Sequence, residues 1–126
     1  MTIALQVEQS AQEGAVVTKA FIRAGQQLGL SGKQLAAIID VSEAQISRMG
    51  SGLISLHSSN HHSWDGALLL TRIYLGLLSM FGDLTTAKLW LHGYNTALRG
   101  IPVELIANFE GLIDVTRYVE FSNNRF

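Results

Sequence analysis

The side chains best suited to metal chemistry are three closely spaced histidines, His57, His61 and His62. His57 and His61 would share a face if their segment were helical, which is a spacing that zinc sites use. However, the segment from Gly50 to Ser63 is rich in glycine and serine, which favours a loop, and it lacks cysteine and a nearby set of carboxylates. We therefore expect solvated histidines, no metal and no other cofactor.

Nucleophilic catalysis has no support in the sequence. Serines are plentiful, but none stands in a nucleophile-elbow pattern, and the histidines cluster away from the acidic residues that a triad would need. The chain has no cysteine, so it offers no thiol nucleophile. No glycine-rich phosphate loop follows a strand. We expect a protein that is not an enzyme.

A second set of polar side chains has the types and spacing of a DNA-reading helix. Arg48 could pair with guanine or a phosphate, and Gln45 with adenine or the backbone. Glu43 could accept from cytosine, although an acid there also repels phosphates. Lys33 and Gln34 at the start of the preceding helix, and Ser51 in the following turn, could contact the DNA backbone. The predicted DNA-binding residues are therefore Lys33, Gln34, Glu43, Ala44, Gln45, Ser47, Arg48 and Ser51.

Two local motifs position these side chains. Ser31 with Gln34 forms a predicted capping box, and Ser42 with Gln45 repeats it eleven residues later. Two helix starts this close leave room only for a short helix, a tight turn and a second short helix, which is a helix-turn-helix within residues 32–51. Asp40 occupies its turn, where aspartate tolerates a left-handed backbone. A helix-turn-helix used only for packing stays as an alternative.

Helical periodicity extends along nearly the whole chain, and no segment alternates like a strand. We predict an all-α fold: a flexible tail over residues 1–14, a helix-turn-helix and loop over 15–62, and a helical dimerisation or partner-binding domain over 63–126. The first helix should end near Gly29, and a long helix opened by residues 63–66 should run to about Phe81. Helices should follow from Leu84 to about His92, in a short piece through Leu98, after Pro102, and from about Phe109 to Phe121.

Composition narrows the class of protein. The 126 residues are 48% hydrophobic, enough for a core, with a net charge of −1 that does not itself attract nucleic acid. The absence of cysteine fits a reducing cytoplasm, and the N-terminus does not resemble a secretory signal. The most apolar segment, residues 67–81, is interrupted by Arg72 and is shorter than the ~20 residues that cross a bilayer. We therefore expect a cytoplasmic protein without membrane contact, which binds DNA mainly as a dimer.

Two long segments resemble known families. The run LGLSGKQLAAIIDVSEAQISRMGSG resembles the Xre-type helix-turn-helix of phage repressors in its caps and branched apolar residues. The run FGDLTTAKLWLHGYNTALRGIPVELIANFEGLIDVTRYVEF resembles the C-terminal toxin-binding domain of the Xre/MbcA/ParS antitoxins. That family often has two glycines before the proline, where this chain has Arg99 and Gly100. The matching residues are Phe81, Gly82, Ala87, Trp90, Leu91, Asn95, Leu98, Gly100, Pro102, Leu105, Glu110, Gly111 and Val115.

The resemblance implies a bacterial antitoxin paired with a RES-domain toxin, an enzyme that consumes NAD. In such pairs the C-terminal domain covers the active-site cleft of the toxin, and the helix-turn-helix lets the complex repress its own operon. Cations and aromatic rings suit a pocket built for a phosphate-bearing dinucleotide. By position, the implied toxin-binding residues are Arg99, Arg117, Tyr118, Phe121, Arg125 and Phe126.

Three functions therefore compete after this reading of the sequence. The first is an antitoxin that neutralises a toxin, represses its operon at operator DNA and forms a homodimer within the complex. The second is a stand-alone phage-type transcriptional repressor. The third is a small metal-dependent enzyme that uses the histidines.

Overall fold

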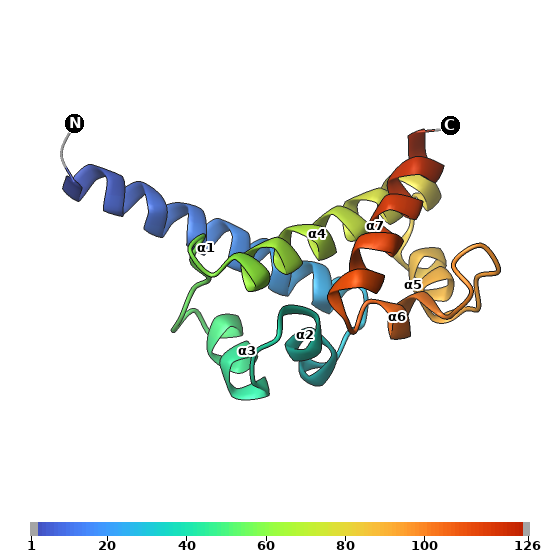
Figure 1. The fold of residues 1–126 in the computed structure, drawn as a ribbon, viewed down its shortest axis with the longest axis horizontal. Helices are drawn as coiled ribbons and strands as arrows, with labels where there is room; N and C mark the ends of the chain where they lie inside the picture. Colours follow the sequence, from blue (N-terminus) through green and yellow to red (C-terminus); the bar gives the residue numbers. More distant parts are fainter. Residues whose placement is uncertain (1–2, 125–126) are drawn as a thin grey trace.

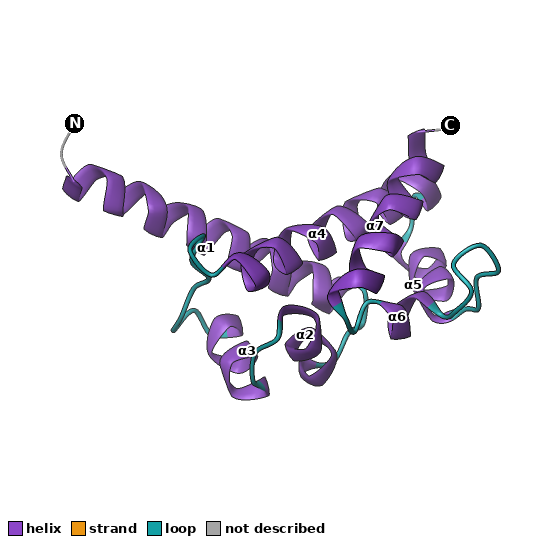
Figure 2. Cartoon of the chain, in the orientation of Figure 1, coloured by secondary structure: helices purple, strands orange, loops and turns teal. Residues whose placement is uncertain are grey.

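The structure is a computed structural model that describes residues 3–124, and all regular secondary structure in that range is helical (Figure 1, Figure 2). A single bridge between extended residues joins Asn95 and Gly100. The predicted all-α fold, with a helix-turn-helix followed by a helical C-terminal part, is confirmed. The helices are α1 (Ile3–Gln27), α2 (Gly32–Ile39), α3 (Glu43–Gly50), α4 (His61–Phe81), α5 (Leu84–His92), α6 (Pro102–Leu105) and α7 (Phe109–Asn124).

Helix α4 is the central element of the fold (Figure 1). It packs most extensively against α7 and α1, and it also contacts α2 and α5. Leu70, Ile73 and Leu77 of α4 are completely buried and belong to one continuous core. Because neighbours enclose α4 on several sides, its sequence is apolar on most faces rather than on one stripe. One helix thus supports both the helix-turn-helix and the C-terminal helices.

Both capping boxes of the helix-turn-helix form as predicted. The Gln34 N–H donates to Ser31 Oγ at 3.1 Å, while the Ser31 N–H donates to Gln34 Oε1 at 2.8 Å. The Gln45 N–H and the Ser42 N–H make the equivalent pair of bonds, at 3.1 and 3.0 Å. These bonds satisfy backbone groups that a helix start otherwise leaves unpaired. Helices α2 and α3 therefore begin where the sequence places them.

The turn between α2 and α3 is held by its own backbone and by α4. Asp40 has the predicted left-handed conformation, with φ 56° and ψ 54°, and its N–H donates to the Ala36 carbonyl. Ser63 of α4 is buried, and its hydroxyl donates to the Ile39 carbonyl at 2.8 Å. This bond satisfies a carbonyl at the end of α2 and ties the helix-turn-helix to the central helix.

The N-terminal part of the chain differs from the prediction. A flexible tail over residues 1–14 is wrong for residues 3–14, which form the first half of α1. The first buried residue is Gly14, so residues 3–13, which we call the arm, continue the helix past the core (Figure 1). Helix propagation costs little once a turn exists, so a packed helix readily extends into an unpacked segment.

Smaller differences occur at three other places. Helix α4 begins at His61 rather than within residues 63–66, and α7 ends at Asn124 rather than at Phe121. The predicted short helix through Leu98 is wrong: Asn95 and Gly100 exchange backbone hydrogen bonds across a tight loop. Helix α6 begins at Pro102, as predicted.

No single helix among the described residues is long and apolar enough to span a membrane. Helices α4 and α5 reach the necessary length and composition only when taken together, and the chain bends by 117° between them.

Candidate functional site

The outer face of α3 carries four of the predicted DNA-binding side chains. Glu43, Ala44, Ser47 and Arg48 are exposed, whereas Ile46 and Met49 on the opposite side are buried against the core. Burial of one face therefore presents the other face to solvent. Exposed residues near the start of such a helix are the ones that reach base edges in a major groove.

Gln45 and Gln34 are more restricted than the sequence suggests. Both side chains are partly buried, and the Oε1 atom of each accepts the N–H of its capping serine. A glutamine reads adenine through its amide oxygen and its amide N–H groups together. While the boxes hold, Gln45 can offer only its N–H donors to DNA.

The remaining predicted DNA contacts flank α3. Lys33 is exposed in the first turn of α2. Ser51 is exposed just after α3, and its hydroxyl donates to the Arg48 carbonyl at 3.1 Å. The structure thus brings the predicted set onto two packed helices and the turn that follows them.

Two basic residues beside this surface are absent from the predicted set. Lys19 and Arg23 of α1 line a groove of about 600 Å³ together with Ser51 and Gly52, and none of the described residues lining it is acidic. Because they are four residues apart, they lie on one face of α1, and this basic face could have been predicted from the sequence. Only the tertiary packing of α1 beside the end of α3 makes that signal relevant to phosphate binding.

The three clustered histidines do not converge. His61 and His62 lie in the first turn of α4, where the sequence predicts a loop, and the His62 ring packs 4.9 Å from that of Phe109. His57 stays in the loop, where its Nδ1 lies 2.7 Å from Ser59 Oγ. Across residues 3–124, no group of three or more His, Asp or Glu side chains is placed to hold a metal ion.

The predicted toxin-binding residues point in different directions. Arg117 and Phe121 are exposed one turn apart on α7. Tyr118 instead stacks on Trp90 of α5, with ring centroids 6.1 Å apart and planes 17° from parallel. Arg99 is exposed in the loop before α6, with a left-handed φ of 58° at the position where the family often has glycine. Arg125 and Phe126 lie outside the described residues.

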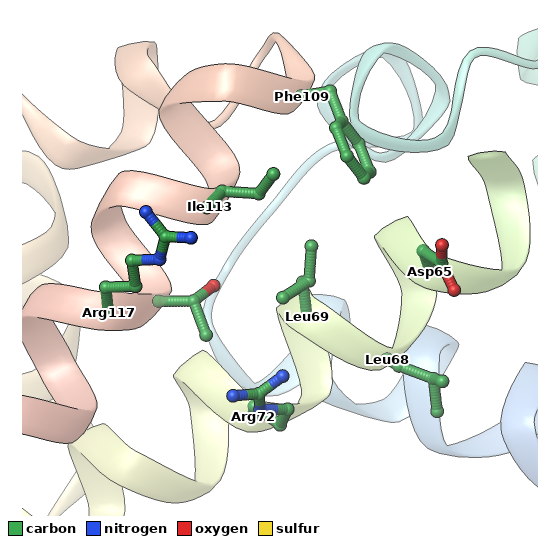
Figure 3. A pocket seen from close by; sticks show the side chains of 8 residues that line it. Asp65, Leu68, Leu69, Arg72, Phe109, Ile113 and Arg117 are labelled. Atoms are coloured by element: carbon green, nitrogen blue, oxygen red, sulfur yellow. The ribbon is translucent and has the colours of Figure 1, made fainter.

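A groove of about 480 Å³ separates α4 from α7 (Figure 3). Arg72 of α4 and Arg117 of α7 line it, and Leu69 and Ile113 contribute apolar surface. The Arg72 guanidinium donates two hydrogen bonds to the Glu120 carboxylate, and these bonds lower the pKa of Glu120 and raise the pKa of Arg72. Arg72 is therefore engaged within the fold, whereas Arg117 makes no ion pair with any described residue.

Helix α5 and the loop after it expose two further large side chains. Leu89 of α5 is 70% exposed and Tyr94, in the loop after α5, is 68% exposed. Large exposed apolar side chains are common at binding surfaces. Leu89 does not share the buried face of α5, which Ala87 and Leu91 form. Its position in the helical repeat can be read from the sequence, but Leu89 is not among the predicted toxin-binding residues.

Comparison with known protein families gives two matches. Residues 8–59 match the antitoxin Xre-like helix-turn-helix domain, a range that includes most of α1, all of α2 and α3, and most of the loop before α4. Residues 77–120 match the antitoxin Xre/MbcA/ParS C-terminal toxin-binding domain, which runs from the end of α4 into α7. No curated protein matches the chain. The two matches together span well over half of the sequence, in the order helix-turn-helix then toxin-binding domain, and the chain therefore belongs to the Xre/MbcA/ParS antitoxin family.

Proposed function

We propose that this antitoxin binds a cognate RES-domain toxin, blocks the active site at which the toxin consumes NAD, and represses the operon of the pair through its helix-turn-helix. The observation that carries the proposal is the match of residues 77–120 to the toxin-binding domain. We propose a RES-domain toxin because the chain resembles antitoxins that are paired with toxins of that kind. In this proposal the chain itself catalyses nothing.

The exposed face of α7 is the part of the toxin-binding domain best suited to the cleft. Arg117 supplies a cation that no described carboxylate neutralises, and Phe121, one turn on, exposes 63% of its surface. A site for a phosphate-bearing dinucleotide favours a guanidinium and a flat apolar ring. Arg99, exposed in the loop before α6, is a further candidate for contact with the toxin.

Repression follows from the exposed face of α3, with help from a second copy. The chain has a net charge of −1 and an acidic Glu43 beside Arg48, so one copy alone has little electrostatic attraction to DNA. A homodimer doubles the contacts and matches a two-fold operator. We place the complex in the cytoplasm, where both the operon and NAD are found.

Co-expression with the neighbouring toxin gene tests the antitoxin role. The native chain should restore growth and co-purify with the toxin, and Arg117→Glu should weaken both by reversing the charge offered to the cleft. Arg23→Glu is the matched control, because it reverses an exposed arginine on α1, outside the toxin-binding domain. Failure of the native chain to neutralise the toxin would overturn the proposal, and a promoter shift without neutralisation would favour a stand-alone repressor.

A further inference from the structure

The groove between α1 and the end of α3 holds two cations that no described carboxylate neutralises. Lys19 and Arg23 are exposed on one face of α1, and neither makes an ion pair with any described residue. The rest of the described lining is uncharged and includes the hydroxyl groups of Ser51 and Ser55. Two neighbouring cations without a counter-charge attract an anion. The groove is therefore a candidate anion site.

The end of α3 cannot hold an anion through its own backbone. The N–H groups of Ser51, Gly52 and Leu53 all donate to carbonyl oxygens of α3. The C-terminal end of a helix also carries a partial negative charge, which repels anions. An anion in this groove therefore needs side chains from another element. Helix α1, which packs against α3, supplies them.

Gly50 leaves open space in the groove. It is an exposed lining residue in the last turn of α3. A Cβ atom added there would meet nothing within 4 Å, and the residue does not have a left-handed φ, so neither packing nor backbone conformation requires glycine. Glycine weakens a helix relative to alanine, but it lets a ligand come close to the backbone. This bare surface beside two cations suits an extended, anionic backbone.

The position of the groove relative to α3 identifies the anion as DNA. Helix α3 has eight residues and is therefore about 12 Å long, similar to the major-groove width of roughly 12 Å. When the start of such a helix contacts base edges, its far end lies near the edge of the groove, where the sugar-phosphate backbone passes. We propose that Lys19 and Arg23 bind backbone phosphates of the operator. This inference rests on the proposed repression and names further residues that carry it.

These contacts give α1 a different role from α3. Phosphate contacts fix the register and orientation of a protein on the duplex, but they carry no sequence information. Lys19 and Arg23 should therefore raise the affinity for every duplex by the same factor, whereas the exposed face of α3 selects the operator. Cations gathered beside α3 also offset the repulsion from Glu43, in a chain whose net charge is −1.

Binding of the full chain to the promoter and to an unrelated duplex, each across a salt series, tests this role. Lys19→Gln and Arg23→Gln should each weaken binding to both duplexes equally, by roughly tenfold near about 0.1 M salt, and should reduce the slope of log affinity against log salt by about 1. Arg23→Lys should keep most of the affinity, because an ammonium also binds phosphate. Lys88→Gln is the matched control: it removes the same charge from an exposed lysine of α5, outside the groove, and should change neither quantity. Native slopes for both glutamine variants would overturn the proposal.

Gly50→Leu tests the open space without removing a charge. The new side chain should occupy the groove, weaken binding to both duplexes and reduce the salt slope, because the phosphate contacts of α1 would be lost. Circular dichroism should show native helix content for this variant and for the charge variants. A folded Gly50→Leu chain with the native affinity and slope would mean that the DNA backbone passes elsewhere, against the proposal.

This inference and the antitoxin role fail separately. A native chain that binds neither duplex, alone or with its toxin, would overturn both the phosphate contacts and repression, but not neutralisation. A native chain that shifts the promoter, with glutamine variants that bind equally well, would overturn the phosphate contacts alone. Arg23→Glu should still neutralise the toxin. Loss of neutralisation in that variant would make the groove a toxin-binding surface instead of a DNA-binding one.

Discussion

Gly76 of α4 lies directly against Val119 of α7. A Cβ atom added at Gly76 would be 2.5 Å from Cγ1 of Val119, closer than real carbon atoms approach, and Val119 is completely buried. Valine has a stiff χ1, so its methyl group cannot easily turn away. The glycine therefore sets how closely the central helix approaches the helix that carries Arg117 and Phe121.

Gly76→Ala should destabilise the protein. Overpacking at such a contact costs about 1–3 kcal/mol, only partly offset by the about 1 kcal/mol that alanine gains over glycine inside a helix. Urea denaturation should show a lower midpoint. Gly32→Ala is the control, because nothing lies within 4 Å of the added atom, and its midpoint should hardly change. Equal or greater stability of Gly76→Ala would show that α4 and α7 can separate without cost.

Ser42→Ala should remove one capping box and destabilise α3 by about 1 kcal/mol. The Gln45 N–H would lose its acceptor, the Ser42 hydroxyl, while the bond from the backbone N–H of residue 42 to Gln45 Oε1 could still form. Chemical denaturation measures the effect. Ser47→Ala, at an exposed serine of the same helix, should stay within about 0.5 kcal/mol of the native chain. A Ser42→Ala chain as stable as the native one would mean that water replaces the cap fully.

Glu43→Gln and Arg48→Ala should change operator affinity in opposite directions. Removing the carboxylate removes repulsion from phosphates, so Glu43→Gln should bind the promoter more tightly. Arg48→Ala should bind more weakly, and if Arg48 contacts a phosphate the slope of log affinity against log salt should fall by about 1. Gel shifts across a salt series provide the measurement. An unchanged Arg48→Ala shift would indicate that α3 only packs.

Acid should weaken the link between Arg72 and Glu120. The hydrogen bonds from Arg72 lower the pKa of Glu120 below its ordinary value of about 4.3. The ion pair therefore contributes stability above that value and loses it as the pH falls through the lower pKa of the folded state. Because the side chains are 53% and 38% exposed, the contribution is small. Glu120→Gln should lower the urea midpoint near neutral pH and match the native chain in acid, while Glu104→Gln should do neither.

Local sequence was sufficient to predict the helix-turn-helix. The capping boxes of Ser31 and Ser42 join residues three apart, and each helix start depends on nothing more distant. The left-handed Asp40 was predictable for the same reason, because its side chain and position in the turn are local features.

Features that depend on distant contacts were not predictable in this way. Tyr118 was predicted to bind the toxin, but it packs on Trp90, which lies 28 positions earlier and meets it only after α5 and α7 pack. Lys19 and Arg23 matter for DNA only because α1 lies beside the end of α3. Residues 3–14 were predicted to be part of a flexible tail, whereas in the structure they extend α1, because the packing of the rest of that helix supports its continuation.

The most direct test of the account is the rate at which the purified RES-domain toxin consumes NAD. An equimolar amount of the native chain should suppress NAD loss, and Arg117→Glu should restore much of it, because the guanidinium that we propose to enter the cleft would be replaced by an acid. A toxin that consumes NAD at an unchanged rate in the presence of excess native chain would contradict the central claim.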